Sequence, residues 1–306
     1  MSDNTEISWA HHTLNFWMGC DKVAPECAHC YIARGLFWGG RQPYGAVYRT
    51  APAGWGNAAR WQRELEQCRL LYGDRAYRVF TCSISDFFSA RADEWRAEAW
   101  KIIHDTPSLV WLVLTKRPER IASHLPPDWG MGYPNVWLGT STGCRQTLNK
   151  MDTLRAIPAA LRFVSAEPLL EDISGDINLE GFGWVATGGE SGLGPEYVWN
   201  ATGDWREEFH TTGRRVMNIE WAARLRDRVK TAGLPFLFKQ ITAEYPGTGI
   251  NALGREWHEF PAPPQGLVWA PRKEIPRRHP YMLTRGQIRQ LWEAHRADKS
   301  LCNTEI

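Results

Sequence analysis

The sequence predicts an α/β protein whose parallel sheet forms a partial or complete TIM-type (βα) barrel. Short apolar segments recur along the 306 residues, and each precedes polar residues and a helix-compatible stretch. Short segments that are apolar throughout are typical of strands buried on both faces of a parallel sheet. Strands that alternate with helices are joined by right-handed crossovers and run parallel. The seven expected strands are Thr13–Met18, Arg78–Ile84, Leu109–Thr115, Asn135–Thr140, Leu161–Ser165, Phe182–Thr187 and Leu234–Lys239.

Three helices are expected between these strands, at Ala90–His104, Arg117–His124 and Asn218–Ala232. The third has apolar residues at helical spacing, and Gly233 followed by Pro235 ends it in the usual order. We expect one barrel domain over residues 1–242 and a C-terminal extension over 243–306 that packs on the barrel. Residues 192–213 are an insertion after the sixth strand, and a last helix is expected at Arg285–Lys299.

The composition sets limits on the class of protein. With 43% hydrophobic residues the chain can bury a large core, and its net charge of +2 argues neither for nor against a polyanionic partner. No apolar run approaches the roughly 20 residues that span a bilayer, and Met1–Thr5 is unlike a signal peptide. We therefore expect a cytoplasmic protein without a membrane partner. The 17 tryptophans either pack in the core or, in part, line a groove and stack on bases.

Three cysteines stand close together directly after the first expected strand. Cys20, Cys27 and Cys30 have the spacing C-x6-C-x2-C, while the other four cysteines are scattered singly. Such a loop can hold a [4Fe–4S] cluster with three thiolates and leave the fourth iron open for S-adenosylmethionine (SAM). One alternative is structural zinc, which usually takes four ligands; His29 lies inside the C-x2-C turn, where its ring hardly reaches the same ion. The other is three unrelated buried cysteines, against which the close spacing argues.

Polar and Gly-rich motifs follow the expected strands, at the rim where barrels place their chemistry. Lys116, with Arg117, can hold a carboxylate or phosphate by charge-assisted hydrogen bonds. Glu167 and Lys239 are either catalytic or partners in a structural ion pair. The segment from Gly188 to Gly192 reads GGESG, in which Glu190 can accept from an ammonium group. The motifs are SISD (83–86), TKRP (115–118), GTST (139–142), SAEP (165–168), GGES (188–191) and KQ (239–240).

Six segments, in this order, resemble a phage- and prophage-associated radical-SAM-like family that is largely of unknown function. They are GCDKVAPECAHCY (19–31), LVLTKRPERI (112–121), NVWLGTS (135–141), RFVSAEPLL (162–170), WVATGGESG (184–192) and RRVMNIEWAARLRDRVKTAGLPFLFKQ (214–240). The resemblance implies a partial TIM-type barrel, a [4Fe–4S] cluster on Cys20, Cys27 and Cys30, and SAM as cosubstrate. It places Gly188, Gly189 and Glu190, with Ser191 beside them, near SAM. The chain departs from the family in a longer stretch before Arg214 and in the region after residue 240.

Three functions are compatible with these features. The first is a radical SAM enzyme with an external one-electron reductant that rearranges an amino-acid-modified thymine in phage DNA, located in the host cytoplasm. The second is a DNA repair lyase that splits a pyrimidine photoproduct. The third is a non-enzymatic, zinc-containing phage protein that binds DNA or another partner.

Two further groups of residues are candidates for a role in the site under the two enzymatic hypotheses. Tyr31, Cys82 or Cys144 can donate a hydrogen atom or quench a radical, although a buried cysteine is more often structural. The late basic residues Arg277 and Arg278 can contact phosphate, together with aromatic residues that contact bases. The alternative for this region is a solvated surface with aromatic anchors. Its aromatic residues are Trp257, Trp269, Tyr281 and Trp292.

Overall fold

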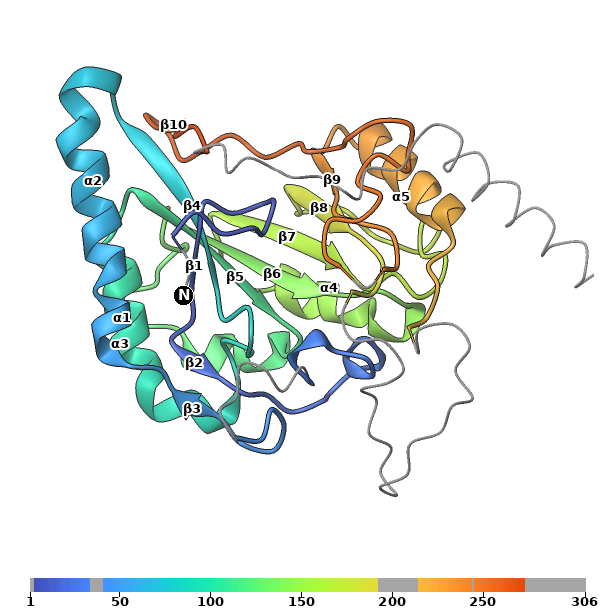
Figure 1. The fold of residues 1–306 in the computed structure, drawn as a ribbon, viewed down its shortest axis with the longest axis horizontal. Coiled ribbons are helices and arrows are strands. Elements are labelled where there is room, and N and C mark those ends of the chain that lie inside the picture. The colour runs from blue at the N-terminus through green and yellow to red at the C-terminus, as the bar shows by residue number, and fades with distance from the viewer. Residues whose placement is uncertain (1–2, 34–40, 192–213, 244, 273–306) are drawn as a thin grey trace, which may run out of the picture.

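Seven parallel strands lie side by side in chain order and form an open, curled half-barrel (Figure 1). The computed structural model describes residues 3–33, 41–191, 214–243 and 245–272. In the described sheet β1 and β9 are the two edges, so the predicted α/β fold with a partial barrel is confirmed. The strands are β1 (His12–Leu14), β4 (Arg75–Thr81), β5 (Leu109–Thr115), β6 (Val136–Ser141), β7 (Leu161–Ala166), β8 (Trp184–Thr187) and β9 (Phe236–Phe238).

The first predicted strand, Thr13–Met18, is divided between two sheets. Its beginning belongs to β1, which pairs with β4, whereas Trp17–Met18 forms β2 and pairs antiparallel with β3 (Tyr48–Arg49). Between them the carbonyl groups of Asn15 and Phe16 accept hydrogen bonds from Oγ1 of Thr50. The chain therefore leaves the main sheet after Leu14, just before the cysteine loop begins.

Two of the three predicted helices are present. The segment Ala90–His104 forms the 3-10 turn η4 (Ala90–Ala92) and the helix α3 (Asp93–His104). The segment Asn218–Ala232 forms α5 (Ile219–Thr231), and the side chain of Asn218 caps it by accepting from the backbone N of Glu220 at 2.8 Å.

The third predicted helix, Arg117–His124, is wrong as an α-helix. It consists of two 3-10 turns, η5 (Pro118–Arg120) and η6 (Ala122–His124). Proline has no N–H to donate, and the backbone N of Arg117 is already bonded to Oγ1 of Thr115 at 2.9 Å. The chain therefore tightens into i→i+3 bonds directly after β5.

Three helices were not predicted: α1 (Pro52–Trp55), α2 (Asn57–Tyr72) and α4 (Asn149–Arg155). In α2 the buried residues Ala58, Trp61 and Leu65 recur on one side, which is the spacing of a helix that packs on a sheet. The remaining short elements are η1 (Pro25–Cys27), η2 (Tyr31–Ala33), η7 (Arg145–Thr147) and β10 (Val268–Trp269).

Both faces of the sheet are buried, and aromatic rings fill the inner one. The inner cluster includes Trp9, Phe80, Trp137, Phe163 and Trp184. The rings of Trp9 and Phe80 lie 4.5 Å apart, and those of Phe163 and Trp184 lie 5.4 Å apart. The interpretation of tryptophan as core packing is confirmed for these residues. Because this cluster fills the concave side of the sheet, the open space is left at the carboxyl-terminal rim.

The described part of the C-terminal extension packs on the half-barrel at both ends of the strands. Its first residues bond to the segment after β9, where the backbone N of Gly247 donates to Oε1 of Gln240 at 2.9 Å, and its later residues lie at the amino-terminal ends. The strand β10 pairs with Arg75 and Ala76 at the start of β4, and Nε1 of Trp184 donates to the carbonyl of Glu259 at 3.0 Å. Figure 1 shows the part that leads to β10 crossing above the sheet.

This placement corrects part of the expected base-contacting surface. The ring of Trp257 packs against Phe236 and that of Trp269 against Trp137, so neither lines the pocket described below. The other members of that surface, Arg277, Arg278, Tyr281 and Trp292, lie outside the described residues. So do the insertion at 192–213 and the helix expected at Arg285–Lys299. Among the described helices, none is long and apolar enough to cross a membrane.

Candidate functional site

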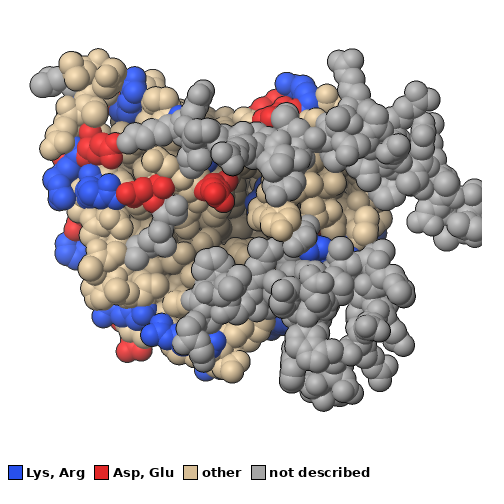
Figure 2. All heavy atoms as spheres, viewed as in Figure 1, with Lys and Arg blue, Asp and Glu red and all other residues tan. Residues whose placement is uncertain are grey.

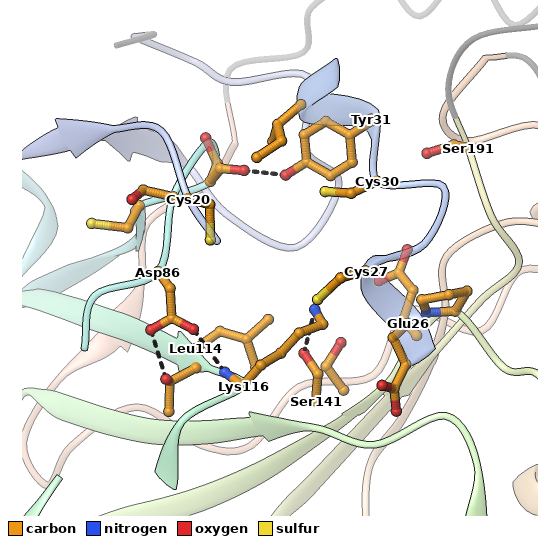
Figure 3. A pocket seen from close by; sticks show the side chains of 18 of the residues that line it. Cys20, Glu26, Cys27, Cys30, Tyr31, Asp86, Leu114, Lys116, Ser141 and Ser191 are labelled. Carbon is orange, nitrogen blue, oxygen red and sulfur yellow. Dashed lines mark hydrogen bonds between the residues drawn. The ribbon is translucent and has the colours of Figure 1, made fainter. Parts of the chain in front are cut away.

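A pocket lies at the carboxyl-terminal ends of the strands, and the cysteine loop forms part of its wall (Figure 3). Cys20, Cys27 and Cys30 all line it. Every one of the predicted rim motifs contributes at least one residue as well, so the structure brings together segments that lie up to 219 residues apart in the chain, from Cys20 to Lys239. The contributions of the rim are Ser83, Ser85, Asp86, Thr115, Lys116, Arg117, Ser141, Ser165, Glu167, Pro168, Gly189, Glu190, Ser191 and Lys239.

The three cysteine side chains line the same cavity, at different points of its wall. Within the described part of the chain, no group of three His, Cys, Asp or Glu side chains is placed to hold a single metal ion, and the described cysteines are free. A cuboidal cluster binds each thiolate on a different iron atom, so it requires sulfurs around a cavity instead of around a point. The donor set of three thiols on one cavity fits such a cluster.

Cys20 is joined to the barrel rim through Arg117. Nη1 of Arg117 lies 3.9 Å from the Cys20 sulfur and 2.9 Å from Oδ2 of Asp86, and Nη2 donates to the carbonyl of Asp21 at 2.9 Å. Burial and the nearby Asp86 raise the pKa of the Cys20 thiol to about 11, although Arg117 acts in the opposite direction. The Cys20 thiolate therefore needs a further positive charge, such as iron, to form near neutral pH.

Asp86 holds the loops after β4 and β5 together. Its Oδ1 accepts from Oγ1 of Thr115 at 2.7 Å and from the backbone N of Phe88 at 2.9 Å, and its Oδ2 accepts from the backbone N of Lys116 at 2.9 Å. The carboxylate is buried. Asp86 thus orients Arg117 instead of facing the open pocket as a free acid.

Lys116 faces the other two cysteines. Its side chain extends toward Cys27, and Nζ lies 3.2 Å from Oγ of Ser141 (Figure 3). Burial lowers the pKa of Lys116, but the charges of Cys27 and Cys30, with those of Glu26 and Asp86, outweigh burial and raise it. The ammonium group is therefore charged at neutral pH and available to an anionic ligand.

Glu26 anchors the cysteine loop from behind, and sequence reasoning missed it. Its Oε1 accepts from the backbone N of Gly143 at 2.8 Å and from Oγ1 of Thr147 at 2.5 Å. Burial raises the pKa of Glu26, but these hydrogen bonds and the charge of Lys150 outweigh it and lower the pKa. Residue 143 must be glycine, because a Cβ there would lie 1.8 Å from the carbonyl oxygen of Pro168.

Glu190, predicted to lie near SAM, is in contact with two side chains, those of His29 and Arg215. Its Oε2 lies 3.0 Å from Nδ1 of His29, and its Oε1 accepts from Nε of Arg215 at 2.7 Å. The neighbouring Gly189 is required by packing, since a Cβ would lie 2.3 Å from the backbone N of Thr242. The residue type at 189 is therefore explained without a ligand. Ser191 lines the pocket, and the carbonyl of Gly188 accepts from the backbone N of Leu169; contact of these residues with SAM stays a prediction.

The two candidate catalytic residues are paired with each other. Nζ of Lys239 lies 2.7 Å from Oε1 of Glu167, and both side chains are mostly buried at the pocket wall. The two residues therefore form an ion pair in the structure, which is the second of the two interpretations. A catalytic role stays a prediction.

The hydrogen-donor candidates differ in their access to the pocket. Cys82 and Tyr31 line it, and the Tyr31 hydroxyl donates to the carbonyl of Ser83. Cys144 lies behind the loop, with its sulfur 3.8 Å from Oε1 of Glu26. Cys82 also has a left-handed backbone, with φ at 55°, which is rare outside glycine.

A family described as "Protein of unknown function (DUF5131)" matches residues 4–210, which is more than half of the sequence. The chain belongs to this family. The match includes the cysteine loop and all the rim motifs up to GGESG, so the pocket is built largely from the DUF5131 region. Among curated proteins, none matches the chain.

The DUF5131 chain shares its fold with solved structures of spore photoproduct lyase. One is this lyase complexed with dinucleoside spore photoproduct, with a TM-score of 0.51, 14% identity and coverage of 77% of this chain and 78% of the other. A mutant of the lyase with the same ligand gives a TM-score of 0.50 at 12% identity, and a further mutant gives 0.50 at 13%, both with the same coverage. At such identities the likeness concerns the fold.

Proposed function

We propose that this DUF5131 chain is a radical SAM enzyme that acts on a nucleic-acid-related substrate. The observation that carries the proposal is the placement of Cys20, Cys27 and Cys30 on one pocket at the carboxyl-terminal rim of a parallel half-barrel. Barrels place their chemistry at this rim, and the cysteines meet there with Lys116, Glu167 and Lys239.

The residues that would hold a [4Fe–4S] cluster are the three cysteines. When bound and reduced, such a cluster supplies the electron that cleaves SAM to methionine and a 5′-deoxyadenosyl radical. Lys116 offers a protonated ammonium beside Cys27, which suits the carboxylate of the methionyl group. Arg117, oriented by Asp86, supplies a second positive charge beside Cys20.

For the reaction itself, we favour rearrangement of an amino-acid-modified thymine in phage DNA. An isomerisation returns the abstracted hydrogen atom to the product, so it needs no net oxidant. The ion pair of Lys239 and Glu167 offers both an ammonium and a carboxylate at the pocket wall, and these groups match the charges of an amino-acid substituent.

A second candidate reaction is cleavage of a DNA photoproduct. Its support is the shared fold with an enzyme whose solved complex contains a dinucleoside spore photoproduct. Either reaction requires contact with nucleic acid. On the face drawn in Figure 2, the described basic and acidic side chains are interspersed and form no continuous basic patch.

The experiment is an anaerobic incubation of reconstituted protein with SAM and dithionite, followed by liquid chromatography and mass spectrometry of the digested nucleosides. One sample contains DNA with amino-acid-modified thymine and another contains ultraviolet-irradiated oligonucleotide. An isomeric nucleoside in the first sample supports rearrangement, and loss of photoproduct in the second supports the lyase. The absence of both products, together with the absence of 5′-deoxyadenosine when the protein is incubated with SAM alone, would contradict the enzymatic proposal and favour the zinc-containing binding protein.

A further inference from the structure

Every acceptor position of the Glu190 carboxylate is filled. Oε1 accepts from Nε of Arg215 at 2.7 Å and lies 2.5 Å from Nη2 of the same residue. Oε2 accepts from the backbone N of Arg215 at 2.7 Å and lies 3.0 Å from Nδ1 of His29. A carboxylate has about four lone-pair positions, so none remains for the ammonium group of a ligand. The side chain is only 3% exposed.

The two partners of Glu190 both act on the cysteine loop. His29 lies between Cys27 and Cys30, and because a carboxylate only accepts, its Nδ1 carries the shared proton. Nη2 of Arg215 also donates to the carbonyl of Pro25 at 2.9 Å. The contacts therefore hold the loop on both sides of Cys27, at residues 25 and 29.

Arg215 and Glu190 are themselves held by hydrogen bonds to the segment that follows β9. The hydroxyl of Thr242 donates to the carbonyl of Arg215 at 3.0 Å and accepts from the backbone N of Met217 at 2.9 Å. The backbone N of Gly189 donates to the carbonyl of Gln240 at 3.0 Å, and that of Ala243 to the carbonyl of Glu190 at 3.0 Å. Glu190 and Arg215 are thus held by the loops after β8 and β9.

We propose that Glu190 is a positioning residue that fixes the turn carrying Cys27 and Cys30 against the rim of the half-barrel. The GGESG segment then serves the cysteine loop through His29 and Arg215, in place of the direct SAM contact that the family resemblance implies for Glu190. Residues that orient ligands in this way raise the affinity of a site by keeping the donor atoms in place before the metal arrives. The inference rests on the proposed function for the identity of the group that the turn holds.

The test compares Glu190→Gln with a matched control, Glu171→Gln. Glu171 also accepts from the backbone N and the guanidinium of a single arginine, Arg145, but at the outer surface. The first readout is the rate at which iodoacetamide alkylates each cysteine in cluster-free, full-length protein, measured by peptide mass spectrometry. The second is the iron content per chain after anaerobic reconstitution.

In Glu190→Gln we expect Cys27 and Cys30 to be alkylated at least about tenfold faster, which corresponds to a loss of roughly 1.4 kcal/mol in holding the turn. Cys20, held separately by Arg117, changes less. The iron content falls below half of the wild-type value, and Glu171→Gln behaves as wild type.

Unchanged alkylation and iron content in Glu190→Gln would overturn the inference, and unchanged values with loss of SAM binding would restore Glu190 as a ligand contact. If the wild type itself takes up no iron, the proposed function fails, while the alkylation rates still test the positioning role. If Glu190→Gln does not fold, Arg215→Lys and His29→Gln each remove one side of the arrangement. Failure of both to speed alkylation would equally overturn it.

Discussion

The guanidinium of Arg117 lies 3.9 Å from the sulfur of Cys20, across the rim of the pocket. Its other contacts, to Asp86 and to the carbonyl of Asp21, keep it there. The first cysteine is therefore tied to the end of β5, while the other two are tied to the end of β8 through His29 and Arg215. Together with the bond of Glu26 to Gly143, these contacts of the barrel position one loop.

Replacement of Arg117 tests its electrostatic role. In reconstituted Arg117→Gln, loss of a positive charge beside Cys20 disfavours the more negative reduced state, so we expect the midpoint potential to fall by about 60 mV, a factor of ten for a one-electron couple. Redox titration followed by EPR measures this. Arg91→Gln is the control, since Arg91 pairs with Asp21 at the surface. Equal potentials in wild type and Arg117→Gln would contradict the role.

Lys116→Met tests the predicted contact with the SAM carboxylate. We expect the dissociation constant of SAM to rise about tenfold or more, because a charge-assisted hydrogen bond is lost, while the iron content stays unchanged. Equilibrium dialysis with radiolabelled SAM measures the constant. Lys101→Met is the control, because Lys101 pairs with Asp105 on the exposed side of α3. An unchanged constant in Lys116→Met would remove Lys116 from the site.

Gly189→Ala separates packing from ligand binding. The new Cβ would lie 2.3 Å from the backbone N of Thr242, so we expect the free energy of unfolding to fall by about 1–3 kcal/mol even without SAM or iron. Chemical denaturation of the cluster-free protein measures it. In Gly175→Ala, where no heavy atom lies within 4 Å of the new Cβ, the stability should stay close to that of wild type. Equal stabilities of the two variants would argue that the loop relaxes freely.

Because His11 is buried and neutral, we expect the free energy of unfolding to fall in mild acid. Burial, followed by the charge of Arg78, lowers the pKa of His11 from 6.5 to about 3. The ring is neutral in the structure, since Nδ1 accepts from the backbone N of Arg78 and Nε2 lies 2.8 Å from the carbonyl of Ala270. Between pH 6.5 and about 3 the unfolded state binds a proton that the native state does not. The free energy of unfolding should therefore fall with falling pH, by up to about 1.4 kcal/mol per pH unit.

The comparison that checks this is denaturation at pH 7 and pH 5 for wild type and His11→Gln. The wild type should lose more stability between the two pH values than the variant, which has no ring to protonate. Parallel losses in the two proteins would show that another group governs the acid sensitivity.

The strands were predictable because they are apolar on both faces, and β5 was predicted with its bounds as observed. The rim motifs followed, since the carboxyl ends of parallel strands meet at one edge. The turn after β5 was mistaken for a helix, although Pro118 and Thr115 favour tight turns there. Helix α2 was missed, although its buried face has helical spacing.

The partners of the site residues were harder to predict than the site residues themselves. Glu26 bonds to Gly143, 117 residues away, and Glu190 bonds to His29, 161 residues away. Nothing in the local sequence distinguishes a carboxylate that anchors a distant loop from one that awaits a ligand. Only the filled acceptor positions of Glu190, visible in three dimensions, favour the first interpretation over the second.

The most direct test of the central claim is the iron and sulfide content of anaerobically purified protein, with EPR after dithionite reduction, with and without SAM. The account predicts about four irons per chain, the number in a [4Fe–4S] cluster, and a reduced-cluster signal that changes when SAM is added. It predicts the loss of both in Cys27→Ala. Zinc without iron in the anaerobically purified protein, or an iron signal that persists in Cys27→Ala, would contradict it.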